Sequence, residues 1–240
     1  WVDLVQRLEE AGADMIECSM SCPQGEHSIA EEGKKASNAI PAADRDLMKS
    51  TTQAIVRARK KNTPIIVKMT PNVTDIVDIA NGAVEGGADA LCAIDTVRGF
   101  IGIDLETGYP KLNVRGLSTW GGLSGPAVKP IALGCVSKLT KALNIPVAGV
   151  GGVSNWQDAA EFLLLGATNI QVCTAISRYG FGMVQNMEKG LLRYMEQKGY
   201  ATLDDMVGAS LPYLVDHSEL SLDNHLHCTI DEAVCLKCGS

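Results

Sequence analysis

Short apolar runs alternate with helical stretches along most of the chain, and this alternation constrains the fold more than any other feature. The apolar, β-branched runs are expected as strands at residues 14–18, 65–69, 90–94, 146–150 and 169–173. Helical periodicity is found at 2–11, 44–61, about 74–85, 129–143, 155–165 and from 174 to about 197. Strands that alternate with helices are typical of parallel βαβ units. The sequence therefore predicts an α/β fold with one helix in front of the first strand.

Two features favour a (β/α)8 TIM barrel over a doubly wound sheet. The long loops follow strands and the short loops precede them, as expected when all the chemistry lies at one rim of a barrel. The last two strands end in small-residue turns, at 149–152 and at Cys173-Thr174. These turns match the phosphate site that such barrels build after strands seven and eight. If the last two strands are the seventh and eighth of a barrel, counting back makes 14–18 the fourth strand. We therefore expect a barrel that lacks its first three strands in this sequence.

The composition agrees with an α/β domain and argues against several kinds of partner. The 240 residues are 46% hydrophobic, and they include 24 glycines but only 5% aromatic residues. A net charge of −7 argues against a nucleic-acid groove or an anionic membrane surface. No apolar run approaches the roughly 18 residues that span a bilayer, and the sequence shows no signal peptide. We therefore expect a cytoplasmic protein without nucleic-acid or membrane partners.

Glycine-rich turns precede two of the expected helices. One is Gly151-Gly152, and the other runs from 121 to 125 as Gly-Gly-Leu-Ser-Gly. A lone glycine pair is ordinary loop chemistry, because glycine adopts backbone conformations that other residues avoid. Two such turns in front of helices favour a ligand that carries a phosphate, since helix N-termini bind anions.

Lys68 and Cys22 are candidates for chemistry at the same rim. Lys68 lies inside an apolar strand, where an unpaired cation is costly, so it either reaches water from the strand end or stabilises an anionic cofactor or intermediate. Cys22 follows a strand and precedes Pro23. Most free cysteines are small buried hydrophobes, but a thiol at the ligand rim can act as a general acid or base.

The C-terminal tail contains His225, His227 and Cys228, followed by Cys235 and Cys238 in a C-x-x-C spacing. Such a group could close a zinc site. It could equally begin an iron–sulfur motif, which needs a further cysteine. The spacing alone leaves both alternatives open.

Six motifs in this order resemble those of the dihydropyrimidine and dihydroorotate dehydrogenases. Within that family the resemblance is to the FMN-binding catalytic subunits of bacterial NAD-dependent dihydropyrimidine dehydrogenases. Each motif is modest alone, whereas the ordered set is specific. The motifs lie at 17–23, 68–76, 95–97, 121–125, 149–152 and 171–174.

The resemblance implies a role for each matching residue. Cys22 matches the cysteine that exchanges a proton with the substrate, and Lys68 matches the lysine beside the N1–C2 edge of the flavin. Thr96 matches a polar residue at the pyrimidine. Cys235 and Cys238 match the first two cysteines of a ferredoxin-like pair of 4Fe–4S clusters, which favours iron–sulfur over zinc. The residues that match the FMN ribityl and phosphate segments are Ser124, Gly125, Gly151, Gly152, Cys173 and Thr174.

Two substrate-binding positions depart from the family pattern. Ser19 and Asp95 stand where the family usually has asparagine. An asparagine amide offers both a donor and an acceptor, whereas an ionised Asp95 can only accept hydrogen bonds. The hydroxyl of Ser19 also has a shorter reach. The sequence therefore favours a ligand edge that is rich in donors at Asp95.

The resemblance implies an FMN-dependent oxidoreductase that reduces the C=C bond of uracil, thymine or a related small unsaturated ring. Electrons would arrive through iron–sulfur clusters from a separate FAD-containing, NAD(P)H-dependent subunit, and the enzyme would be an oligomer. Residues 1–198 would form the FMN-binding barrel portion, and residues 199–240 would lead into a truncated iron–sulfur domain. Two alternatives are a non-redox TIM-barrel lyase or isomerase that binds a phosphorylated substrate, and a non-catalytic electron-transfer subunit.

Overall fold

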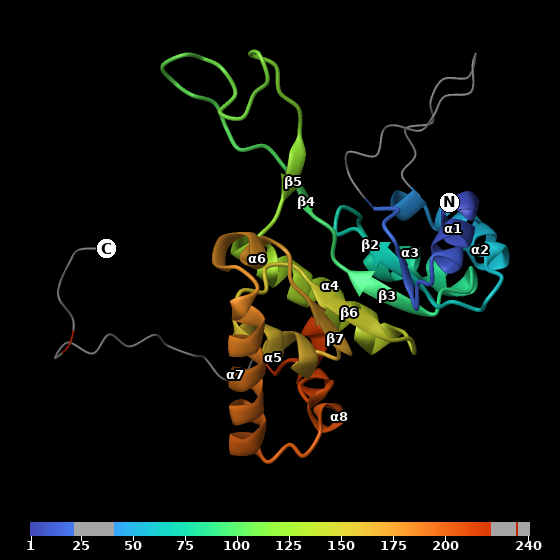
Figure 1. Cartoon of the computed structure of the whole chain (residues 1–240). Coiled ribbons are helices and arrows are strands. Elements are labelled where there is room, and N and C mark those ends of the chain that lie inside the picture. Colours follow the sequence, from blue (N-terminus) through green and yellow to red (C-terminus); the bar gives the residue numbers. More distant parts are fainter. Residues whose placement is uncertain (22–40, 222–233, 235–240) are drawn as a thin grey trace.

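The computed structural model describes residues 1–21, 41–221 and 234, and its elements are labelled in Figure 1. The main strands are β1 (Ile16–Cys18), β2 (Ile65–Met69), β3 (Ala90–Ala93), β6 (Val147–Val150) and β7 (Asn169–Gln171). The helices are α1 (Val2–Glu10), α2 (Arg45–Ala58), α3 (Ile76–Glu85), α4 (Lys129–Ala142), α5 (Trp156–Leu164), α6 (Thr174–Tyr179), α7 (Gly182–Lys198) and α8 (Leu203–Met206).

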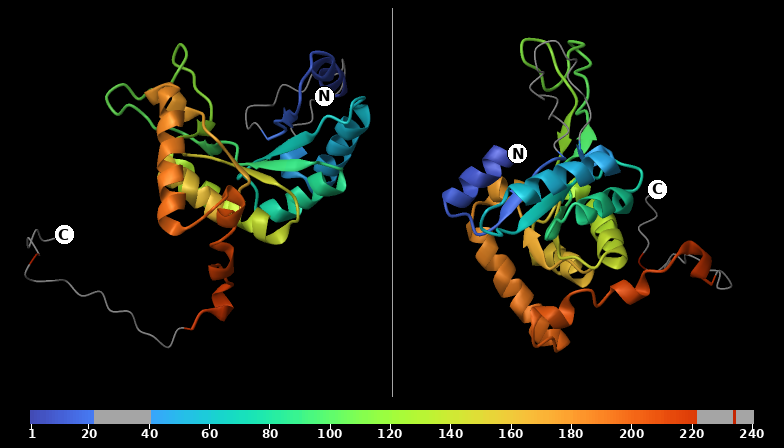
Figure 2. Two further views of the ribbon diagram at one scale, coloured as in Figure 1. Left: turned by 60° about the horizontal axis from the view of Figure 1, so that its bottom comes forward. Right: turned by 90° about the vertical axis from the view of Figure 1, so that its right-hand side faces the viewer.

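The five main strands form one parallel sheet whose spatial order, β1-β2-β3-β6-β7, follows their order in the sequence. Helices lie between successive strands, and α2 packs on α3, α3 on α4, α4 on α5 and α5 on α7. A doubly wound sheet would reverse its strand order and place helices on both faces. The sequential order and the continuous row of helices are those of a (β/α)8 barrel wall (Figure 2). The predicted fold class is confirmed, and within the described residues the sheet is open, with β1 and β7 at its edges.

Local sequence explains where three of the helices begin. Asp44 caps α2 by accepting a hydrogen bond from the backbone N–H of Leu47 at 2.8 Å. Asp75 and Asn155 cap α3 and α5 in the same way. Each cap satisfies one of the N–H groups that the first turn of a helix leaves without a partner. These helices are therefore stabilised at their starts by their own side chains.

The two faces of the sheet differ in polarity. One face packs against the helices through fully buried residues such as Val67, Leu91 and Val147, which meet Ile55 and Phe162 in one core cluster. Alternate residues of the same strands point to the other face, because side chains alternate along a strand. That second face carries a polar row: Glu17 on β1, Lys68 on β2, Cys92 on β3 and Gln171 on β7.

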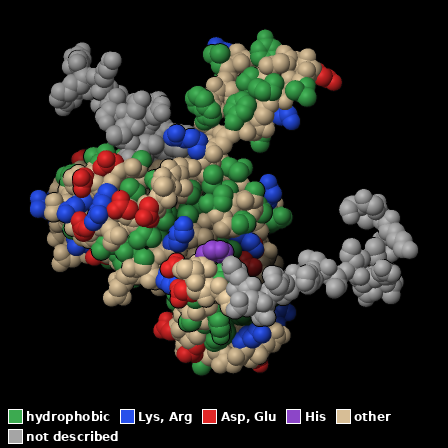
Figure 3. Space-filling model, turned by 180° about the vertical axis from the view of Figure 1, so that it is seen from behind, with side chains coloured by type: hydrophobic (Ala, Val, Ile, Leu, Met, Phe, Trp, Pro, Cys, Tyr) green, Lys and Arg blue, Asp and Glu red, His purple; other side chains and the backbone are tan. Residues whose placement is uncertain are grey.

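Residues 97–123 form a projecting arm between β3 and α4. Its base is an antiparallel pair, β4 (Val97–Gly99) and β5 (Gly121–Leu123), which the short runs in a glycine-rich stretch did not reveal. The arm extends away from the sheet (Figure 1), and hydrophobic side chains gather on its surface (Figure 3). Leu105, Leu117 and Trp120 are among its exposed apolar residues.

The C-terminal helical stretch also differs from the expectation. The predicted single helix from 174 to about 197 is two helices, because Gly180 ends α6 and α7 begins at Gly182. After α7, Met206 of α8 is buried against Ala160 and Leu163 of α5. No helix in the described residues is long and apolar enough to cross a membrane.

Candidate active site

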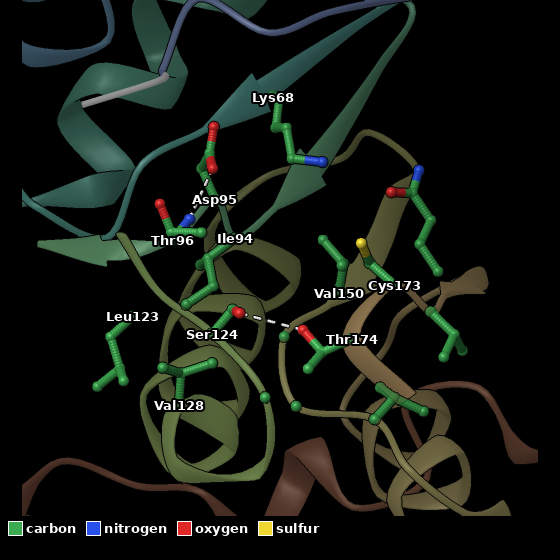
Figure 4. Close-up of a pocket in the computed structure, with 16 residues that line it drawn as sticks. Lys68, Ile94, Asp95, Thr96, Leu123, Ser124, Val128, Val150, Cys173 and Thr174 are labelled. Carbon is green, nitrogen blue, oxygen red and sulfur yellow. Dashed lines mark hydrogen bonds between the residues drawn. The ribbon is translucent and has the colours of Figure 1, made fainter. Parts of the chain in front are cut away.

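A pocket lies at the carboxyl ends of β2, β3, β6 and β7, which is where TIM barrels place their chemistry. Lys68 and Asp95 lie toward one end, while Ser124 and Thr174 lie toward the other (Figure 4). The structure thus brings together most of the residues singled out from the sequence. Those that line the pocket are Lys68, Asp95, Thr96, Ser124, Gly125, Gly151, Gly152, Cys173 and Thr174.

Three other sequence candidates fall outside the described residues. They are Cys22, Cys235 and Cys238; the candidate zinc ligands His225, His227 and Cys228 also lie outside, so all these roles stay predictions. Among the described residues, no cluster of three or more His, Cys, Asp or Glu side chains could hold a metal ion. The part of the site that the structure describes is therefore the pocket itself.

Two short helices begin at the Ser124 end of the pocket, and in the described residues they start without a side-chain cap, as α1 and α7 also do. The short 3-10 helix Pro126–Val128 begins at Gly125, and α6 begins at Cys173. No side chain in the described part of the chain caps either start, in contrast to α2, α3 and α5. Ser124 and Thr174 link the two segments through their hydroxyls, whose oxygens are 3.1 Å apart. Uncapped backbone N–H groups at two adjacent helix starts favour an anion.

Gly152 brings the two glycine-rich turns into contact. A Cβ atom at this position would lie 2.9 Å from the carbonyl oxygen of Gly125 and 2.9 Å from the backbone nitrogen of Lys129. The φ of Gly152 is +80°, which disfavours other residues. The Lys129 ammonium is 2.7 Å from Asp158 and 2.8 Å from Glu161, so these carboxylates neutralise its charge. An anion at this end would therefore depend on backbone N–H groups and hydroxyls.

A hydrogen-bonded network connects the polar row on the second face of the sheet. Lys68 Nζ lies 3.1 Å from Glu17 Oε1, and Gln171 Nε2 donates to Glu17 Oε2 at 2.6 Å. Cys92 Sγ lies 3.3 Å from Gln171 Oε1 and donates to it. Sequence reasoning assigned no role to Glu17, Gln171 or Cys92. Side chains alternate between the two faces of a strand, and this alternation could have placed the three residues on the same face as Lys68. Only the strand register shows that they are neighbours.

The network keeps Lys68 and Glu17 charged and Cys92 neutral. Burial lowers the pKa of Lys68, but the hydrogen bond to Glu17 and the negative charges of Glu17 and Asp95 more than offset this effect and raise it. Burial raises the pKa of Glu17, but hydrogen bonds from Gln171 and Lys68 outweigh it, so this pKa is lowered. Burial raises the pKa of Cys92 to about 12. The ion pair is therefore fully formed at neutral pH beside a protonated thiol.

Asp95 is the centre of a second cluster, at the carboxyl end of β3. Its Oδ2 accepts hydrogen bonds from Ser21 Oγ at 2.8 Å and from Ser19 Oγ at 3.3 Å. Its Oδ1 accepts from the backbone N–H of Thr96 at 2.6 Å. Sequence reasoning named Ser19, Asp95 and Thr96 but missed Ser21, which is only 1% exposed. The structure thus places the two positions that depart from the family pattern in direct contact.

The family model for dihydroorotate dehydrogenase matches residues 1–195 of this chain. The chain belongs to this family. The matched segment contains every residue that lines the pocket, as well as Ser19, Glu17 and Cys22. Cys235 and Cys238 lie beyond it. The family assignment therefore covers the pocket and leaves the tail outside.

The curated relatives carry two kinds of name. The NAD-dependent dihydropyrimidine dehydrogenase subunit PreA of Escherichia coli K12 is 36% identical over 100% of this chain and 57% of its own length. The chloroplastic dihydropyrimidine dehydrogenase (NADP(+)) of Arabidopsis thaliana is 35% identical over 92% of this chain and 51% of its own. The dihydroorotate dehydrogenase B (NAD(+)) catalytic subunit of Methanosarcina acetivorans is 40% identical over 88% of this chain and 62% of its own. The chain thus spans between half and two thirds of these relatives.

Proposed function

We propose that this chain forms the FMN-binding catalytic part of an oxidoreductase that reduces the C=C bond of a pyrimidine-like ring. The observation that carries the proposal is the two-ended pocket. One end offers uncapped helix starts and glycine turns for a phosphate, and the other offers Lys68 and the Asp95 cluster for a polar ring. The relatives named dihydropyrimidine and dihydroorotate dehydrogenase support the same chemistry.

The residues of the pocket fit the ribityl phosphate of FMN. Ser124 and Thr174 supply hydroxyls, and the turns at Gly125 and Gly151-Gly152 supply backbone without side chains. When bound, FMN supplies hydride exchange with the substrate double bond. Lys68 brings positive charge to the pocket, and Glu17 fixes the position of its ammonium.

Cys22 is the proposed proton donor to the substrate carbon beside the one that receives hydride. This role rests on the family motif and on the position of Cys22 directly after Ser21, which contacts Asp95. Residues 1–198 form the FMN-binding portion in this proposal, and residues 199–240 lead into an iron–sulfur segment that begins with Cys235 and Cys238. A partner subunit that contains FAD and oxidises NAD(P)H would deliver the electrons.

The flavin assignment is tested by the absorbance of the purified protein and of the cofactor released on denaturation. We expect a flavin spectrum in the unchanged protein and a loss of bound FMN in Gly152→Ala, because the new methyl group enters the contact with Gly125. Gly199→Ala is the matched control, since Gly199 has a similar φ of +75° at the end of α7 with open space around it. A colourless, correctly folded protein would instead support a non-redox lyase or isomerase.

The proton-transfer role is tested by Cys22→Ala in the complex with its electron donor. We expect turnover to fall by about 100-fold or more, the usual contribution of a positioned general acid. Cys135→Ala is the control, because Cys135 is a half-buried residue of α4 outside the pocket, and it should leave turnover unchanged. Turnover of Cys22→Ala within a few-fold of the unchanged protein would contradict the role and favour a non-catalytic electron-transfer subunit.

A further inference from the structure

Asp95 presents one remaining acceptor site. An ionised carboxylate has about four lone-pair positions, two on each oxygen. The Ser19 and Ser21 hydroxyls occupy both positions of Oδ2, and the N–H of Thr96 occupies one position of Oδ1. Asp95 lines the pocket, so the remaining position on Oδ1 is the one that a ligand can use.

Ser19 adds a second hydrogen-bond acceptor beside Asp95. A hydroxyl has one proton, and Ser19 donates its proton to Asp95. The oxygen of Ser19 therefore offers only lone pairs to a ligand. Ser19 is exposed, whereas Ser21 is buried and does not face the solvent. Asp95, which lines the pocket, and Ser19, which is hydrogen-bonded to it, thus present two neighbouring acceptors.

The nearby amide of Asn72 does not change this pattern. Its Nδ2 donates to Thr70 Oγ1 at 2.9 Å and to the carbonyl oxygen of Thr96 at 3.0 Å. Its Oδ1 accepts from the backbone N–H of Arg98 at 2.8 Å. Both polar atoms of the Asn72 side chain therefore already have hydrogen-bond partners within the protein. In the described part of the pocket, the cation Lys68 is already paired with Glu17.

We infer that Asp95 and Ser19 select a ring whose edge carries two adjacent hydrogen-bond donors, as in an amidine, where a ring N–H lies beside an amino group. This inference rests on the proposed function, because it takes the pocket to be the site of a pyrimidine-like substrate. On uracil, each N–H lies beside a carbonyl oxygen, which would face the lone pairs of Ser19 or Asp95. In isocytosine an amino group replaces one carbonyl, and the edge becomes donor next to donor. A carboxylate such as that of orotate would meet the negative charge of Asp95.

The test compares isocytosine, uracil and orotate by calorimetric titration of the full protein, with flavin content measured separately. Because uracil would leave one polar pair at this edge mismatched, we expect isocytosine to bind about tenfold or more tightly than uracil, and orotate to bind least. In Asp95→Asn the amide offers a donor and an acceptor, so the preference should shift toward uracil by a similar factor. Asp204→Asn, which removes the same charge from the exposed start of α8, should leave the ratios unchanged.

The inference is overturned if uracil binds as tightly as isocytosine, or if Asp95→Asn does not alter the ratio of their affinities. If Asp95→Asn does not fold, Ser19→Ala removes one acceptor at an exposed position, and it should reduce the isocytosine preference several-fold; an unchanged preference overturns the inference. A protein that holds flavin but binds none of the three rings also overturns it and leaves the flavin proposal standing. A protein without flavin that still prefers isocytosine supports the selection and contradicts only the redox function.

Discussion

Lys68 Nζ lies 3.1 Å from Glu17 Oε1, although the two residues are 51 positions apart in the sequence. They come from the neighbouring parallel strands β1 and β2, and the side chains of Lys68 and Glu17 are 19% and 27% exposed. Gln171, from the far edge of the sheet, binds the second oxygen of Glu17. The network therefore connects β1, β2, β3 and β7, and two of its members, Lys68 and Gln171, line the pocket.

The Lys68–Glu17 pair should contribute a measurable coupling to stability. Because both groups are mostly removed from water, loss of one partner leaves the other charge without compensation. In a double-mutant cycle of Lys68→Met and Glu17→Gln, we expect a coupling of about 1–2 kcal/mol in the free energy of unfolding, reduced from the fully buried case by partial exposure. Urea unfolding measures it. Additivity of the two changes within about 0.3 kcal/mol would contradict the pairing.

Buried thiols in this chain should resist alkylation. Burial raises the pKa of Cys18 to about 11 and that of Cys92 to about 12, so the reactive thiolate is scarce at pH 8. Cys173 is exposed at the start of α6. We expect iodoacetamide to modify Cys173 well before Cys18 or Cys92, as followed by peptide mass spectrometry. In urea, where burial is lost, all three should react at comparable rates; early modification of Cys92 in the folded protein would refute the prediction.

Close packing of α5 on α7 depends on the absence of a side chain at Gly190. A Cβ atom there would overlap the indole ring of Trp156 at the start of α5. We expect Gly190→Ala to lower the free energy of unfolding by about 1–3 kcal/mol, the usual cost of overpacking. Gly134→Ala is the control, because Gly134 is exposed within α4 with open space around it. That change should be neutral or stabilise by up to about 1 kcal/mol, and equal effects of the two changes would contradict the packing argument.

Glu9 should make the stability of the protein sensitive to acid. It is 1% exposed, and its carboxylate accepts hydrogen bonds from the backbone N–H groups of Lys60 at 2.7 Å and Lys61 at 3.1 Å. The bond from Lys60 is the main cause of its lowered pKa. The folded state therefore binds this proton less readily than the unfolded state. The resulting stability is fully present above about pH 4.3, the ordinary value for glutamate, and it is lost as pH falls through the lowered pKa.

The measurement is the melting temperature as a function of pH for the unchanged protein and for Glu9→Gln. We expect Glu9→Gln to melt at a lower temperature at pH 7 and to depend less on pH in the acid range, so that the two curves converge. Glu188→Gln, at an exposed position of α7, should follow the unchanged protein throughout. Parallel curves for Glu9→Gln and the unchanged protein would show that the Glu9 contacts do not respond to acid.

The sequence by itself determined the α/β fold class, the order of the elements and most of the residues at the pocket. The fold class and the order of the elements follow from hydrophobic periodicity, whereas the pocket residues were singled out by glycine turns before helices, by a lysine in an apolar strand and by the family resemblance. The same patterns did not show the β4–β5 arm, because three-residue strands in a glycine-rich stretch have little periodicity.

Only the tertiary structure decided which side chains become partners. The register of β1 against β2 brings Glu17 to Lys68, and the end of β3 brings Asp95 to Ser19 and Ser21. The sequence shows that an ionised Asp95 can only accept hydrogen bonds, but it does not show that Ser19 donates its only hydroxyl proton to Asp95. A side chain's hydrogen-bonding capacity toward a ligand is what remains after its neighbours have been satisfied. Those neighbours come from strands distant in sequence, so only the folded chain specifies them.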